Sequence, residues 1–194
     1  MIFGCIRFFA AGLLVAVGLS GCIDGNVGSS DSSMLPDDSG LSLPDTNMAS
    51  PEGIIVWNDR VFVANANFAY QGASLVFKAG FITVIDSSTG SVVNRIPVPF
   101  PNPQEMAIYG GRLWVLCSGS TTFDPVSSLV TISESGGLAG IELDGIDSAS
   151  EPGVLIPIPS SEGSIVGYPS GMLVDEGRAW LGSGTSASLF LADL

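Results

Sequence analysis

The cysteines, together with the absence of histidine, limit the chemistry that this chain can carry out. Cysteines stand at positions 5, 22 and 117, and no His occurs among the 194 residues. Without His, the chain lacks the usual general base near neutral pH and the commonest metal ligand. Cys117 lies at the end of the apolar run Leu113–Cys117, so we expect a small buried side chain there rather than a reactive thiol.

Arginines recur at matched places in the part of the chain that follows residue 50. They stand at positions 60, 112 and 178, each at the start of an apolar segment. We expect a structural role for them, either capping a turn or pairing with an acid such as Glu105 or Glu176.

Aspartates mark a second repeated position. Asp86, Asp144 and Asp193 each follow an apolar run, and we expect them to accept hydrogen bonds from the turn that follows. Asp144 and Asp147 could also form a calcium-like pair of carboxylates, but no further ligands accompany them. No nucleophile elbow, phosphate loop or metal-ligand spacing occurs, so the sequence assigns no catalytic residue and no metal site.

Composition and charge narrow the range of partners. Lys and Arg total 6 against 19 Asp and Glu, which gives a formal net charge of −13. An acidic surface repels phosphate backbones, so nucleic acid is not expected as a partner. The length suggests one domain, or a domain with an arm, and the hydrophobic content of 46% is enough for a core.

Residues 1–21 have the pattern of a secretory signal peptide. Arg7 is the single charge, and the apolar run from Phe8 to Leu19 is too short to span a bilayer as a helix, which takes about 20 residues. Such a run fits the hydrophobic region of a signal that is removed after export.

The four residues Leu19-Ser20-Gly21-Cys22 resemble the bacterial lipobox. The resemblance implies cleavage before Cys22 and attachment of a diacylglycerol and an N-acyl lipid to that cysteine. Apart from this lipid, we expect no cofactor. Two or three acyl chains anchor a protein stably to a membrane. Ile23 in place of Asp implies transport to the outer membrane of a Gram-negative bacterium. Cys117 would then be the last free cysteine, which leaves no internal disulfide.

Residues 22–50 begin with the lipidated cysteine and continue as a polar segment. The segment is rich in Ser, Asp, Gly and Pro, and it has no Lys, Arg or aromatic residue. Because it lacks the apolar content needed for a core, we expect a flexible linker without folded structure.

Residues 51–194 contain internal repeats of β-strand character. Three hairpins share one pattern, in which a short strand, a tight turn and an arginine precede a second strand with an aromatic residue two places on. The paired segments are 53–57 with 60–64, 105–109 with 112–116, and 170–174 with 178–182. Asn58-Asp59 and Gly110-Gly111 tolerate the positive φ of hairpin turns.

A second module of two further strands follows the first two hairpins and is half present after the third. The expected segments are 81–86 with 91–97, 138–143 with 153–158, and 188–193. The repeats are about 52 and 66 residues long. Four short strands in each repeat are typical of β-propeller blades.

The first repeat is similar to the YVTN-type propeller repeat. The similarity rests on Arg60–Asn65, Ile82–Asp86, Thr89-Gly90, Val92-Val93 and Ile96–Val98, and it is looser in the second repeat. It implies an all-β fold of four-stranded blades, about two and three-quarters of which are present in 51–194. Propellers usually have four to eight blades, so we expect the N-terminal part of a longer propeller. An oligomer that closes the ring and a small sandwich-like stack are the alternatives. An open arc should leave apolar faces exposed.

Two long segments between the second and third strands, 65–80 and 118–137, are expected to be loops on one face, with the links between blades beside them. Aromatic residues there could contact a partner: Phe68, Tyr70, Phe77, Phe100 and Phe123. The alternative is that these segments cap blade edges or form strands of their own.

Three functions are compatible with the sequence. The first is a membrane-anchored envelope lipoprotein whose propeller acts as a scaffold that binds a protein or other ligand, or a second copy, through that face. The second is a lactonase-like or quinoprotein-like enzyme whose site is completed by blades absent from this chain. The third is a structural component of the cell envelope.

Overall fold

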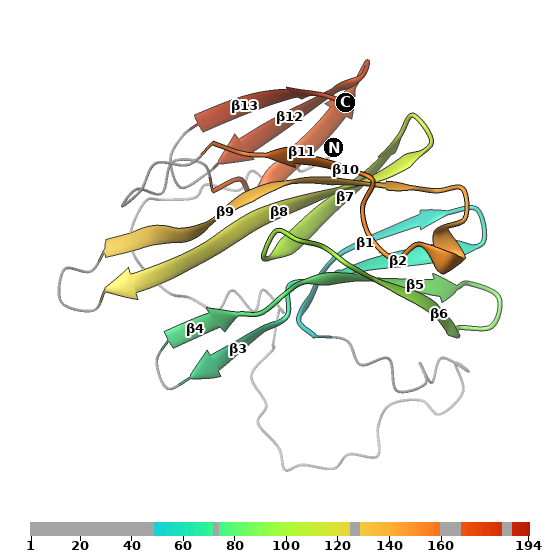
Figure 1. Cartoon of the computed structure of the whole chain (residues 1–194), viewed down its shortest axis with the longest axis horizontal. Helices are drawn as coiled ribbons and strands as arrows, with labels where there is room; N and C mark the ends of the chain where they lie inside the picture. The colour runs from blue at the N-terminus through green and yellow to red at the C-terminus, as the bar shows by residue number, and fades with distance from the viewer. Residues whose placement is uncertain (1–48, 72–73, 125–128, 160–167, 184–187) are drawn as a thin grey trace, which may run out of the picture. The chain divides into compact units, whose positions relative to one another are not determined.

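The computed structural model describes residues 49–71, 74–124, 129–159, 168–183 and 188–194 (Figure 1). Within these ranges the chain forms antiparallel β-sheets, with a single short 3₁₀ turn and no α-helix. The prediction of an all-β fold for 51–194 is therefore confirmed. The signal peptide 1–21, Cys22 and nearly all of the linker to residue 50 lie outside the described residues.

The first sheet contains four strands in the order β1-β2-β5-β6. Its strands are β1 (Pro51–Trp57), β2 (Arg60–Asn65), β5 (Phe81–Asp86) and β6 (Val92–Pro97). Each strand pairs antiparallel with the next, and the strands agree closely with the predicted segments. A separate two-stranded hairpin, β3 (Phe68–Gln71) and β4 (Ser74–Phe77), is inserted between β2 and β5.

The second sheet repeats this order with four strands, β10-β9-β8-β7. They are β7 (Pro103–Tyr109), β8 (Arg112–Asp124), β9 (Leu129–Glu142) and β10 (Val154–Pro157). The 3₁₀ turn η1 (Ile146–Ser148) connects β9 to β10. β8 and β9 are longer than predicted, because pairing continues far beyond the sheet into the segment expected to be a loop.

The third sheet contains the strands β11 (Gly171–Asp175), β12 (Arg178–Ser183) and β13 (Ser188–Asp193). Its hairpin turn has two residues rather than the three expected, because Asp175 already pairs with Arg178. The turn residues Glu176 and Gly177 have φ of 45° and 80°, and Gly110 and Gly111 in the second sheet have 60° and 79°. These values match the left-handed geometry that two-residue hairpins need.

Two apolar cores lie between the three sheets, one at each interface. The first core joins the first and second sheets, with Phe62, Ile82 and Val84 packed against Leu113 and residues that follow it. The second core joins the second and third sheets through Trp114, Leu116 and Leu181. The middle sheet therefore buries both of its faces.

The alternation of side chains along the strands accounts for this stack. In β8, Leu113 and Val115 point to the first core, whereas Trp114 and Leu116 point to the second. Successive residues of a strand point to opposite faces, so one continuous apolar run supplies both. Cys117 is fully buried in the first core, as predicted, and burial raises the pKa of its thiol.

Candidate functional site

The first segment predicted as a loop, 65–80, contains a β-hairpin. The strands β3 and β4 pair antiparallel, and Phe68 is directly opposite Phe77. Their ring centroids lie 6.0 Å apart with an interplanar angle of 61°, which is the edge-to-face geometry that aromatic pairs favour. The expectation of a loop is wrong here, and the alternative of added strands describes the segment.

The second segment predicted as a loop, 118–137, is an extension of the β8–β9 hairpin. Register pairs continue from Gly119 opposite Ser135 to Asp124 opposite Leu129, with an irregularity between Ser120 and Thr121. Phe123 is paired with Val130. This segment is also strand rather than loop, and β4 contacts β8, so the two inserted hairpins lie side by side (Figure 1).

The five aromatic residues predicted to contact a partner lie in different parts of the structure. Phe68 and Phe77 form one pair on the β3–β4 hairpin. The backbones of Tyr70 and Phe123 lie in β3 and β8. Phe100 is partly buried against the first core.

Phe100 has a packing role that the sequence did not suggest. A Cβ added at Gly137 of β9 would lie 2.4 Å from the Phe100 ring, so the ring lies directly on that glycine. Phe100 therefore holds the link between the first two sheets against β9. This contact makes it a weaker candidate for binding than the Phe68–Phe77 pair.

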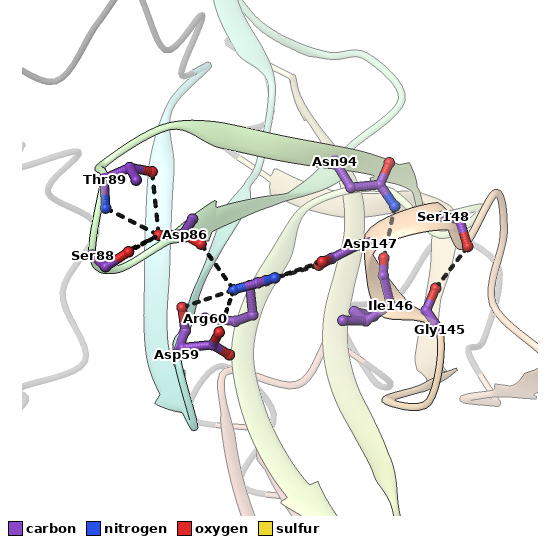
Figure 2. A network of polar contacts seen from close by, with 10 residues as sticks. All are labelled: Asp59, Arg60, Asp86, Ser88, Thr89, Asn94, Gly145, Ile146, Asp147 and Ser148. Atoms are coloured by element: carbon purple, nitrogen blue, oxygen red, sulfur yellow. Dashed lines mark hydrogen bonds and ion pairs between the residues drawn. The ribbon is translucent and has the colours of Figure 1, made fainter.

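A polar network around Arg60 connects the first sheet to η1 (Figure 2). The Arg60 guanidinium donates from Nε and Nη2 to the two carboxylate oxygens of Asp147, at 2.8 Å and 2.6 Å. It also contacts Asp86 Oδ2 at 3.1 Å and Asp59 Oδ2 at 2.8 Å. The bond to Asp147 raises the pKa of Arg60 and lowers that of Asp147. Asp147, which the sequence offered as one carboxylate of a calcium-like pair, is thus bound by Arg60.

Asp86 accepts the hydrogen bonds predicted for it. Its Oδ1 accepts from the backbone N–H and hydroxyl of Ser88, at 3.0 Å and 2.6 Å, and from the same groups of Thr89. These bonds, led by the Ser88 hydroxyl, lower the pKa of Asp86 to about 2. Asn94 of β6 completes the network by donating to the carbonyl of Ile146 (Figure 2). It also donates to the carbonyl of Ala149.

The repeated arginines pair with acids, as expected, but the acids are not the ones named from the sequence. Each arginine is opposite an acid of the third strand of its sheet, so that Arg60 pairs with Asp86, Arg112 with Glu142 and Arg178 with Asp193. In the second sheet Glu142, not Asp144, takes this position. The partners could have been found from the sequence by aligning the repeats as antiparallel strands.

Glu105 and Glu176, the acids named from the sequence, lie elsewhere. Glu105 Oε2 accepts the N–H of Met172 at 2.8 Å and so connects the second sheet to the third. Glu176 is in the turn between β11 and β12. Close by, Asn102 donates to the Tyr168 hydroxyl at 2.9 Å, which ties the links between the sheets together.

The described residues contain no group of three or more His, Cys, Asp or Glu side chains that could hold a metal ion. They also contain no helix with the length and apolar character needed to cross a bilayer. Cys22, the residue expected to carry lipid, lies outside the described residues. The pair of inserted hairpins is the candidate for a binding surface on the basis of the Phe68–Phe77 pair that β3 and β4 bring together.

Comparison with known proteins yields little. No protein-family model matches the chain, and no curated protein matches it either. A solved structure, that of the computationally designed Ika4 protein, is 8% identical and aligns with a TM-score of 0.38. The alignment covers 77% of this chain and 94% of that chain. At this TM-score the similarity carries no argument about fold or function.

Proposed function

We propose that this protein is an exported envelope lipoprotein, held on a membrane by lipid on Cys22, whose sheets are β-propeller blades that form a binding scaffold. The lipobox-like Leu19–Cys22 after an apolar run supports the anchor. The linker to residue 50, rich in Ser, Asp and Gly, gives the folded part reach from the membrane surface. The outer membrane is the proposed location.

The repeated strand order supports the blade assignment. Two sheets each have four antiparallel strands in chain order, and the third begins in the same way. Sheets of this form packed face to face are the unit of a propeller. The YVTN-like residues of the first repeat agree with this assignment.

The binding role rests on one observation, the position of the two inserted hairpins. Both leave their sheets between the second and third strands, and they contact each other through β4 and β8. Functional residues are often carried by segments that a rigid scaffold supports. A protein partner is the proposed ligand, because an aromatic pair on a hairpin suits protein interfaces.

The anchor is tested by the intact mass of the native protein extracted from membranes. We expect the mass of residues 22–194 plus two or three acyl chains, and a Cys22→Ser variant should remain uncleaved and lack the lipid. A cleaved, acyl-free native protein would contradict the anchor. A much larger mass would mean that further blades belong to the chain.

The binding role is tested with the same lipidated protein. We would replace residues 68–77 with a two-residue turn and compare the envelope proteins captured by both forms from detergent extracts. A partner lost with the hairpin supports the role. A partner retained by the shortened form would place the binding surface elsewhere, and so would a partner lost equally after Leu155→Glu, a substitution of an exposed residue on β10.

A further inference from the structure

The far face of the third sheet, on the side away from the second core, is apolar and exposed. Leu173, Trp180 and Leu191 form one row across its three strands in register, and Leu189 follows on β13. Their exposed fractions are 64%, 37%, 52% and 66%, respectively. Soluble proteins rarely leave a contiguous apolar surface of this kind uncovered unless something binds it.

The same row is buried in the first two sheets. The aromatic residue two places after the repeated arginine is Phe62, Trp114 or Trp180. Phe62 is fully buried against the second sheet, and Trp114 is 1% exposed against the third. The far face of the third sheet is thus the third copy of a surface that twice receives a neighbouring sheet.

On the first sheet, it is the opposite face of β1 that is uncovered. Ile54 and Val56 of β1 point away from the first core and are 72% and 60% exposed. Their equivalents in the second sheet, Met106 and Ile108, pack against the first core. In the third sheet, Met172 and Val174 pack against the second core. At both internal interfaces, these positions meet the preceding sheet.

We propose that two copies of this chain associate head to tail, with β1 of one copy on the far face of the third sheet of the other. Ile54 and Val56 would contact Leu173 and Trp180, which reproduces between copies the part of the internal interfaces that the first strand of each sheet forms. The middle of the first sheet's outer face, at Val63 and Ile85, is already 6% and 5% exposed, so the contact follows β1. This inference rests on the sheets and is independent of the lipid anchor.

The interface is heterologous, because the two copies contribute different surfaces to it. If the rotation that relates the two copies brings their remaining free surfaces together, they form a closed ring. If it does not, further copies can add to the free surfaces. The net charge of −13 opposes association through self-repulsion, so salt should favour the assembly. A second copy suits both surfaces at once, since one chain carries both members of the pair.

The test measures the mass of the full chain, purified in detergent, by sedimentation at physiological salt. We expect assemblies of two or more copies, and expect Trp180→Glu and Val56→Glu each to reduce them to single copies. Mixing the two variants should restore a dimer, because one intact surface remains on each. Leu155→Glu, an exposed apolar residue of β10 outside both surfaces, is the matched control and should leave the assembly unchanged.

Cross-linking tests the orientation. Val56→Cys and Trp180→Cys chains in which Cys5 and Cys22 are replaced by Ser should form a disulfide only when mixed, because the remaining natural cysteine, Cys117, is buried. Circular dichroism checks the folding of each variant, and Ile54→Glu and Leu173→Glu replace any that misfolds. The proposal would be overturned if the wild type is a single copy, if the Trp180→Cys chain links to itself, or if mixing the variants restores no dimer. It would also be overturned if further sheets of a longer chain, or another protein, cover the far face of the third sheet.

Discussion

Phe62, Trp114 and Trp180 occupy one position in three similar hairpins, yet the exposed fraction is 0%, 1% and 37%. Local sequence does not explain the difference, because each aromatic follows the arginine at the same spacing in a strand of the same register. The neighbouring sheet does: the second sheet covers Phe62, and the third covers Trp114. The burial of this aromatic position is therefore set by the neighbouring sheet, and the far face of the third sheet and β1 of the first sheet remain exposed.

The largest expected difference in stability is between removal of Trp114 and removal of Trp180. Trp114→Ala should cost about 3–5 kcal/mol of stability, as is usual for a large side chain removed from a core. Trp180→Ala should cost less than about 1 kcal/mol at concentrations where copies are separate. Urea unfolding of both variants gives the two values. Equal losses would mean that Trp180 is as well packed as Trp114.

Gly53 and Gly171 are a second matched pair, at equivalent places on the first strands of their sheets. A Cβ at Gly53 would lie 2.1 Å from the Gln104 carbonyl oxygen, whereas a Cβ at Gly171 would meet nothing within 4 Å. Gly53→Ala should cost about 1–3 kcal/mol through overpacking. Gly171→Ala should be neutral or stabilising by up to about 1 kcal/mol. Thermal unfolding of both variants decides, and a neutral Gly53→Ala would mean that β1 and β7 lie farther apart.

The Asp86 network predicts a dependence of stability on pH. The folded pKa of Asp86, about 2, lies below its ordinary value of 3.8, so folding favours the ionised carboxylate. This contribution is fully present above pH 4 and is lost as the pH falls towards 2. The stability advantage of wild type over Asp86→Asn should shrink across that window in urea titrations. Asp144→Asn, at an exposed position, should follow wild type, and an unchanged advantage of wild type over Asp86→Asn would contradict the network.

The smallest contrast is between two arginines at equivalent positions. Arg60 contacts three carboxylates, whereas Arg178 approaches Asp193 at 3.8 Å with both side chains largely exposed. Isolated surface pairs contribute about 0–1 kcal/mol. Arg60→Ala should lower the melting temperature measurably, and Arg178→Ala should leave it unchanged. Equal effects of the two would show that the network adds nothing to a single surface pair.

Much of the fold could be predicted from the sequence because short apolar strands and turn residues are local signals. Phe81–Asp86 and Ser188–Asp193 were placed to the residue. The segments 65–80 and 118–137 are expected from the sequence as loops, with added strands only as the alternative, because they lie outside the repeat and their pairing partners cannot be read from periodicity. The partner of Arg60 was missed for a different reason: Asp147 is distant in sequence and reaches Arg60 only when the sheets stack.

The candidate site was predictable only in part. Phe68 and Phe77 were chosen for their type and place, and the hairpin register brings them together. Phe100 was chosen on the same grounds, but its ring is used to cover Gly137. A glycine opposite an aromatic side chain marks close packing, yet the two can be matched only once the pairing of distant strands is known.

The most direct test of the stacking account is the solvent exposure of the three tryptophans in one sample. The full chain labelled with 5-fluorotryptophan gives ¹⁹F resonances for Trp57, Trp114 and Trp180, assigned by Trp→Phe variants. We predict that Trp114 shows no solvent isotope shift at any concentration, whereas Trp180 shows one in dilute solution and loses it as the concentration rises. In Val56→Glu, Trp180 should keep the shift throughout. A Trp180 resonance that stays solvent-exposed at every concentration in the wild type would contradict the account.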